Sequence, residues 1–150
     1  MIVTFFGHSD FIPDRASEEK MMSLLRETVG NTPAQLFLGG YGGFDSFAYS
    51  CCKRYKAENP DVRLIFVSPY LTPSYQKRHL EYYQKIFDEI IYPEIEDTPP
   101  RFAISRRNKY MAERADIVIV YIKRDYGGAY QAYKHALKKN KRIFNIAKAT

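Results

Sequence analysis

Short apolar segments alternate with amphipathic helical segments along the whole chain, and this alternation restricts the fold more than any other feature. Six β-favouring apolar runs occur, at residues 2–6, 35–38, 63–67, 89–92, 117–122 and 141–146. Between them, apolar side chains recur with helical spacing, as in the stripe at residues 44, 47, 48, 51, 52 and 55. This order predicts one α/β domain over residues 1–150. We expect a Rossmann-like, doubly wound, mostly parallel sheet of about six strands with helices on both faces.

Composition narrows the class of protein further. A chain of 150 residues with 45% hydrophobic and 27% charged residues is typical of a single globular domain. No apolar run reaches the ~20 residues that span a bilayer, and residues 1–6 carry no basic leader, so we expect no membrane partner and no signal peptide. Cys51 and Cys52 are neighbours on a predicted helix, which disfavours a disulfide and favours a cytoplasmic location. The net charge of +6 suits anionic partners without choosing between a nucleotide and a nucleic acid.

Two glycine-rich stretches each follow a predicted strand and precede a predicted helix. The first is Gly-Gly-Tyr-Gly-Gly at residues 39–43, and the second is Gly-Gly-Ala-Tyr at residues 127–130. Glycine allows close approach of a ligand to the backbone, and a helix N-terminus offers unpaired N–H groups to an anion. Right-handed crossovers bring all strand-to-helix turns to the carboxyl edge of a parallel sheet. We therefore expect both loops, together with Gly7, His8 and Ser68, to form one phosphate-binding notch.

With these loops placed, the sequence resembles the SLOG superfamily. This Rossmann-like group contains the core of DNA-processing protein A and the lonely-guy phosphoribohydrolases. The sequence more closely resembles the small stand-alone bacterial members of unassigned function. Four motifs carry the resemblance: Gly7-His8, the Gly39–Asp45 stretch, Arg107-Asn108-x-x-Met111-x-x-x-Ala115-Asp116, and Gly127-Gly128-Ala129-Tyr130. They run from residue 7 to residue 130, so the resemblance covers nearly the whole chain.

The resemblance implies a pocket for a nucleotide or a nucleotide-derived ligand, in which Arg107 matches the superfamily's ligand-binding arginine. It leaves catalysis undecided. The phosphoribohydrolases carry Pro-Gly-Gly-x-Gly-Thr-x-x-Glu at the second loop, and its glutamate is catalytic. The same register here places Lys134 at the glutamate position. Because a cation cannot replace that carboxylate, an enzyme of this type would need another acid, and the candidates are Asp45, Asp125 and His8.

The expected ligand-binding residues come from four turns and one helix. They are Gly7, His8, Gly39, Gly40, Tyr41, Gly42, Gly43, Phe44, Asp45, Ser68, Arg107, Asn108, Gly127, Gly128, Ala129 and Tyr130. Several have alternative interpretations. Asp45 either caps a helix or contacts the ligand, His8 either moves a proton or only hydrogen-bonds, and the tyrosines of the loops either stack on a base or pack. Arg106 and Arg107 are adjacent, so at most one faces the pocket, and we favour Arg107, placed near the start of its helix.

Three functions remain open at this point. The first is a cytoplasmic sensor or binding protein for a phosphorylated, nucleotide-type small molecule, with no required cofactor. No metal is expected, because the three histidines are dispersed and lack metal-ligand spacing. The alternative is an N-glycosidic-bond hydrolase acting on nucleoside monophosphates through a relocated carboxylate. A second alternative is single-stranded nucleic-acid binding; we consider nucleic acid an unlikely partner because the basic run at residues 138–142 suits a helix C-terminus. The tyrosines of residues 75–83 are a candidate homodimer surface.

Overall fold

A parallel six-stranded sheet organises the protein, as the sequence predicts. The computed structural model describes residues 1–69, 72–94 and 97–148. The strands are β1 (Ile2–Gly7), β2 (Ala34–Leu38), β3 (Val62–Val67), β4 (Glu89–Ile91), β5 (Ile117–Tyr121) and β6 (Arg142–Asn145). Their order is β4-β3-β2-β1-β5-β6, and every neighbouring pair is parallel. The chain thus runs outward from β1 in one direction and later crosses back to its other side, which is doubly wound topology.

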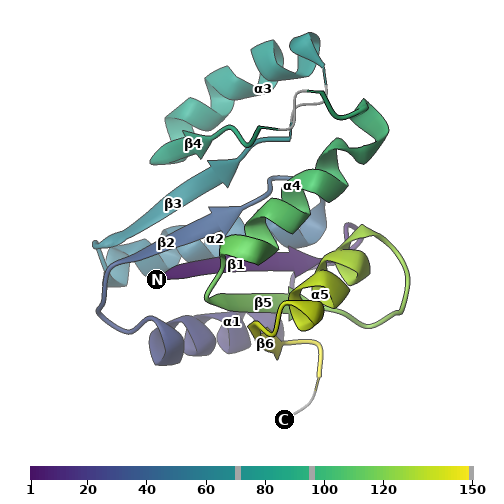
Figure 1. Cartoon of the computed structure of the whole chain (residues 1–150). Coiled ribbons are helices and arrows are strands. Elements are labelled where there is room, and N and C mark those ends of the chain that lie inside the picture. The colour runs from purple at the N-terminus through teal and green to yellow at the C-terminus, as the bar shows by residue number, and fades with distance from the viewer. Residues whose placement is uncertain (70–71, 95–96, 149–150) are drawn as a thin grey trace.

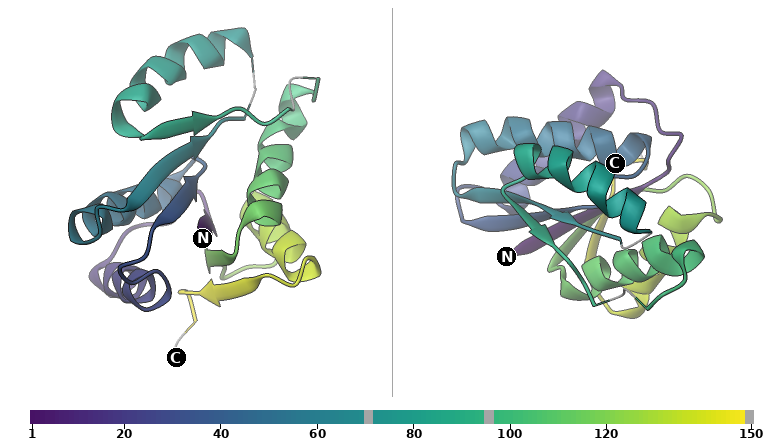
Figure 2. Two further views of the ribbon diagram at one scale, coloured as in Figure 1. Left: turned by 60° about the vertical axis from the view of Figure 1, so that its left-hand side comes forward. Right: turned by 90° about the horizontal axis from the view of Figure 1, so that it is seen from above.

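Helices cover both faces of this sheet. They are α1 (Arg15–Thr28), α2 (Gly43–Glu58), α3 (Pro73–Ile86), α4 (Pro100–Arg114) and α5 (Gly128–Lys138). Figure 2 shows α1, α2 and α3 on one side of the strands and α4 with α5 on the other. The sheet lies between them, with β4 and β6 at its edges (Figure 1). None of the helices in the described parts of the chain combines the length and the apolar character that a membrane span requires.

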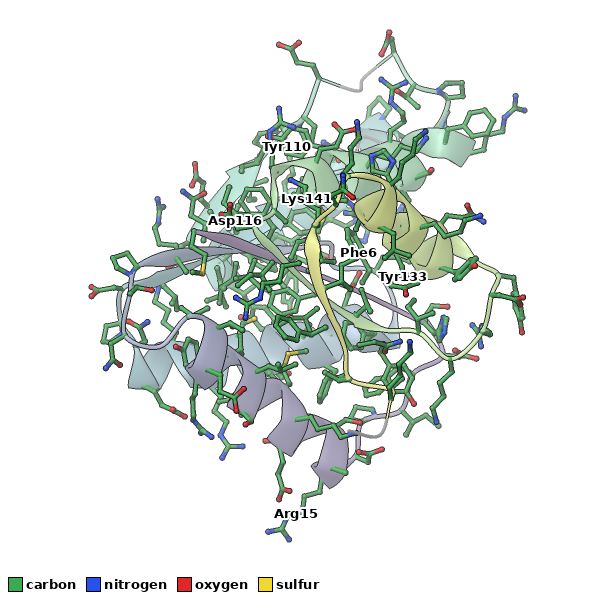
Figure 3. The ribbon with its side chains drawn as sticks, turned by 60° about the horizontal axis from the view of Figure 1, so that its bottom comes forward. Phe6, Arg15, Tyr110, Asp116, Tyr133 and Lys141 are labelled. Atoms are coloured by element: carbon green, nitrogen blue, oxygen red, sulfur yellow. The ribbon has the colours of Figure 1, made fainter. Side chains whose placement is uncertain are left out.

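Two apolar clusters hold the layers together, one on each face. The α1–α2 side contains the predicted stripe of α2, including Cys51 and Cys52, both of which are buried and free. Burial raises the pKa of Cys51 to about 12, so this thiol is unreactive at neutral pH. On the opposite face Phe6 and the small side chains Ala132 and Ala136 allow α5 to lie close to the sheet. Figure 3 shows Phe6 next to α5 and Tyr133 on this helix; Phe6 belongs to the apolar cluster on this face of the sheet, and Tyr133 packs against it.

The way each helix begins differs across the fold. Helices α1 and α3 have side-chain caps, since Asp14 accepts from the Ser17 N–H and Thr72 accepts from the Tyr75 N–H. Helices α2 and α5 instead begin after Gly42 and Gly127, both with positive φ, and neither has a side-chain cap. A helix start without a cap leaves backbone N–H groups for another partner. Helix α4 begins after Pro99 and also lacks a side-chain cap, so the glycine-rich stretches precede two of the three uncapped starts.

Gly7 ends β1 at a position where the fold has no room for a side chain. A Cβ there would lie 2.1 Å from Cγ of Phe44, which is fully buried at the start of α2. We expect Gly7→Ala to lower the free energy of unfolding by about 2 kcal/mol, because overpacking forces the ring or the backbone to move. Urea denaturation followed by circular dichroism measures this. The matched control is Gly128→Ala, whose Cβ meets nothing within 4 Å; equal stability of the two variants would contradict the prediction.

Candidate functional site

The two glycine-rich loops meet at one cavity, as expected from their places in the sequence. The cavity has a volume of about 150 Å³ and lies where β1, β2 and β5 end, beneath the inner face of α4. In Figure 1 the arrowheads of β2 and β3 point toward this edge of the sheet. Gly39 of the first loop and Gly128 of the second both contribute to its wall. Residues separated by about ninety positions in the chain therefore share one concave site.

Ten of the predicted residues line the cavity. They are Gly7, His8, Gly39, Tyr41, Asp45, Arg107, Asn108, Gly127, Gly128 and Ala129. Six predicted residues do not line it: Gly40, Gly42, Gly43, Phe44, Ser68 and Tyr130. Asp125, a candidate acid, is exposed and also lies outside the lining, so among the candidates only Asp45 and His8 stand in the cavity.

Packing within the protein explains most glycines of the first loop. A Cβ at Gly42 would lie 2.7 Å from Cβ of Ser9, and one at Gly43 would lie 2.4 Å from the carbonyl oxygen of Phe11. The Gly43 N–H already donates to the Ser9 carbonyl oxygen at 2.7 Å. A Cβ at Gly40 would press on the Phe66 ring at 2.7 Å. Gly42 and Gly43 let the loops after β1 and β2 touch, and Gly40 leaves room for the Phe66 ring of β3; these are structural roles that require no ligand.

The second loop lacks any such explanation. A Cβ at Gly127 or at Gly128 would meet no atom within 4 Å. Gly127 has a φ of 96°, which favours glycine, whereas Gly128 has no positive φ. No described residue accepts a hydrogen bond from the N–H of Gly128, Ala129 or Tyr130, at the start of α5. Gly128 therefore leaves space beside unpaired donors, the arrangement that suits an anion.

Arg107 is buried to 99% and ties two strands together. Its Nη1 donates to the carbonyl oxygens of Gly39, at 2.7 Å, and Val67, at 2.9 Å, and its Nε donates to Oδ1 of Asn108 at 3.0 Å. The sequence placed Arg107 near the start of its helix, but α4 begins at Pro100, so Arg107 sits two turns inside. Its guanidinium contributes positive charge to the cavity wall, while Nη1 is committed to the backbone. Arg106 is exposed and does not line the cavity, as expected.

Asp45 carries a carboxylate whose pKa lies near neutrality. It is partly buried in the first turn of α2, and its Oδ2 accepts the Tyr41 N–H at 2.8 Å, so it does reach back to organise the helix start. Burial raises its pKa from the ordinary 3.8 to about 6, although the charge of Arg107 and the Tyr41 N–H oppose that rise. A cavity carboxyl that changes charge near pH 6 is suited to accept or donate a proton.

His8 is used as a neutral hydrogen-bonding residue. It is 5% exposed, and its Nε2 accepts the backbone N–H of Lys123 at 3.0 Å, which joins the loop after β1 to the loop after β5. Burial, aided by the charge of Arg124, lowers the pKa of His8. The neutral ring then carries its proton on Nδ1. This geometry favours the hydrogen-bonding interpretation of His8 over proton transfer through Nε2.

The tyrosines of the two loops have different surroundings. Tyr41 is 60% exposed and lines the cavity at its opening. Tyr130 lies outside the lining and packs against the Tyr133 ring, with the ring centroids 6.1 Å apart. Of these two tyrosines, Tyr41 is therefore the one placed to stack on a group that enters the cavity.

Several lining residues were missed by the sequence reasoning. They include Ser9, Ile104 and Arg124. Arg124 lies three residues before Gly127 within a polar run, and nothing in that run indicates which of its charged side chains turns inward. Among the described residues no group of three or more His, Cys, Asp or Glu side chains is arranged to hold a metal ion.

No family model matches this chain, and no curated protein matches its sequence. Solved structures with a similar fold include DNA processing protein A from Helicobacter pylori, with a TM-score of 0.64, 21% identity, and coverage of 97% of this chain and 64% of that one. DNA processing protein A from Streptococcus pneumoniae gives a TM-score of 0.62 with 18% identity, over 95% of this chain and 49% of that one. A protein called TM1055 gives 0.56 with 14% identity, over 95% and 71%.

The chain thus spans less than two thirds of either DNA processing protein A, and all three likenesses concern the fold. The solved structure of the Helicobacter pylori protein is described as giving insight into its single-stranded DNA binding mode. The cytoplasmic location, the homodimer and the cofactor-free site stay predictions. The chain has the Rossmann-like fold found in DNA processing protein A, which is the fold that the resemblance to the SLOG superfamily implies.

Proposed function

We propose that the protein binds a phosphorylated small molecule of nucleotide type in the cavity between its two glycine-rich loops. The observation that carries this proposal is Gly128. It has neither a strained backbone nor a close neighbour, yet it stands at an uncapped helix start beside a cavity. A phosphate at this position accepts hydrogen bonds from the free N–H groups at the start of α5 and lies at the positive end of the helix dipole. Two arginines, Arg107 and Arg124, add positive charge to the same wall.

The size of the cavity indicates how such a ligand sits. Pockets that enclose a drug-sized molecule measure roughly 300–1,000 Å³, and this cavity has about 150 Å³. It therefore encloses the phosphate and the adjoining sugar, while the base remains at the opening. Tyr41 is exposed there and offers a ring on which a base can stack.

Gly128→Val is the variant that tests this proposal. We expect wild-type protein to bind a nucleoside 5′-monophosphate, with AMP, GMP, CMP and UMP as the panel, and Gly128→Val to bind at least about tenfold more weakly. The physical reason is that the new side chain fills the space in which the phosphate meets the N–H groups. Isothermal titration calorimetry measures the affinities.

The matched control is Ser74→Val, which makes a β-branched change in the exposed first turn of α3, outside the cavity. It should leave binding unchanged. No binding of any panel member by the wild-type protein, or equal binding by Gly128→Val, would overturn the proposal. Mass spectrometry of small molecules that stay with the purified protein provides an independent identification of the ligand.

Hydrolysis of an N-glycosidic bond is the second candidate function, and Asp45 is the observation that favours it. Its carboxyl lines the cavity next to Gly39 and has a pKa of about 6. An oxocarbenium-like transition state needs a carboxylate near the sugar carbon, and the proposed binding mode places the sugar beside this wall. Chromatography of nucleoside monophosphates after incubation decides the matter: free base that is absent with Asp45→Asn supports hydrolysis, and no free base with wild-type protein excludes it.

Single-stranded nucleic acid remains the third candidate because of the fold shared with DNA processing protein A. A gel shift with a labelled oligonucleotide at low salt tests it. A shift would reverse our expectation that nucleic acid is an unlikely partner.

A further inference from the structure

Within the described parts of the chain, the guanidinium of Arg124 has a buried hydrogen-bond donor that no other residue pairs with. It lies in the loop between β5 and α5 and lines the cavity. Its Nη1 donates to Oδ2 of Asp10 at 3.0 Å, but its Nε is buried and has no hydrogen-bond partner within the described parts of the chain. A buried donor without a partner is unusual, and each one requires an explanation. The side chain of Asp10, by contrast, is 67% exposed and lies outside the cavity lining.

We propose that Arg124 binds the phosphate of the ligand in the cavity, and that Asp10 is the internal anion that competes with this phosphate for the Arg124 guanidinium. This inference rests on the proposed function, because the competing anion is the phosphate bound at the start of α5. The Nε and Nη2 atoms of a guanidinium form a fork that matches two phosphate oxygens. Nε is buried while Asp10 accepts from Nη1, so the guanidinium must leave Asp10 before this fork can meet a phosphate. Contact with a phosphate supplies the partner that Nε lacks, and Asp10 offers it no such contact.

The exchange requires the Arg124 guanidinium to leave Oδ2 of Asp10 and the ring of Tyr126, whose centroid lies 5.0 Å from Cζ of Arg124. An ion pair as exposed as this one is weak, so its loss opposes binding only slightly. A separate bond, from the Lys123 N–H to Nε2 of His8, joins the same two loops and does not involve Arg124. The loops therefore stay in place while the guanidinium changes partners.

Three variants, measured by calorimetry with AMP, test whether Arg124 binds the phosphate and Asp10 competes for it. Arg124→Gln should bind AMP about tenfold or more weakly, because charge-assisted hydrogen bonds to the phosphate are lost. Asp10→Asn should bind AMP about two- to fivefold more tightly, since the competing carboxylate is gone. The double variant should bind like Arg124→Gln alone. Adenosine, which lacks a phosphate, should bind all four proteins equally.

The controls are Arg26→Gln and Glu58→Gln, which change the net charge by the same amounts. These residues form an exposed ion pair at 2.8 Å and lie outside the cavity lining. Neither control should alter AMP affinity. If wild-type protein binds AMP but Asp10→Asn does not tighten it, or Arg124→Gln does not weaken it, the inference is overturned and the proposed function stands. If wild-type protein binds no phosphorylated ligand, the proposed function itself has failed.

Discussion

Replacing Arg107 with alanine is expected to lower the free energy of unfolding by about 3–5 kcal/mol. The carbonyl oxygens of Gly39 and Val67 both accept from Nη1, and both would lose a charged donor inside the protein. The nearby Asp45 carboxylate would also lose the positive charge that partly offsets its burial. The substitution removes, in addition, the largest fully buried side chain among the residues that the structure describes, and it leaves a cavity.

Two further variants separate these contributions when unfolding is followed in urea. Arg107→Met retains most of the volume but none of the donors, so it should recover the packing loss and leave the protein destabilised. Arg106→Ala changes the exposed neighbour on the same helix and should stay within about 0.5 kcal/mol of wild type. Wild-type stability of Arg107→Ala would show that the buried guanidinium does not hold the ends of β2 and β3 together.

Asp45→Asn is expected to make the protein more stable at pH 7, by up to about 3 kcal/mol. Burial raises the pKa of Asp45 from 3.8 to about 6, and each pH unit corresponds to about 1.4 kcal/mol. At neutral pH the protein therefore holds a carboxylate in surroundings that favour the uncharged form. Asparagine keeps an oxygen that can accept the Tyr41 N–H and carries no charge.

The pH dependence of this effect has a definite sign. Between pH 3.8 and about 6 the folded state binds more protons at Asp45 than the unfolded state does, so its contribution to stability falls as the pH rises. The gain from Asp45→Asn should therefore be small near pH 4 and complete above pH 6. Chemical denaturation of both proteins across this range measures the difference, in which the other titrating groups cancel. A gain that is the same at pH 4 and pH 7, or a loss at pH 7, would show that the pKa of Asp45 is not raised.

These two predictions concern residues in one wall of the cavity that have opposite effects on the stability of the fold. Arg107 stabilises the fold by joining strand ends, whereas Asp45 destabilises it by remaining charged where solvent is scarce. A residue that costs stability is often kept for what it does to a ligand. If Asp45→Asn is the more stable protein and also loses a ligand or a reaction, the cavity is a functional site and not a packing defect.

The alternation of apolar runs and helical stripes determined the architecture, because buried parallel strands must be covered on both faces. The same alternation placed both glycine-rich loops at the carboxyl edge, since right-handed crossovers allow no other arrangement. Gly7, Gly39 and Gly128 were therefore correctly expected to lie close together.

Only the tertiary structure decided which of those residues serve the fold and which remain for a ligand. Gly42 and Gly128 look alike in the sequence, yet a Cβ at Gly42 would clash with Ser9, whereas a Cβ at Gly128 would enter open space. The partners of Arg107 lie 68 and 40 residues away in the chain, and Arg124 meets Asp10 across 114 residues. Local pattern specifies which element a residue belongs to, but the contacts of a side chain at the sheet edge depend on strands and loops that meet only when the sheet forms.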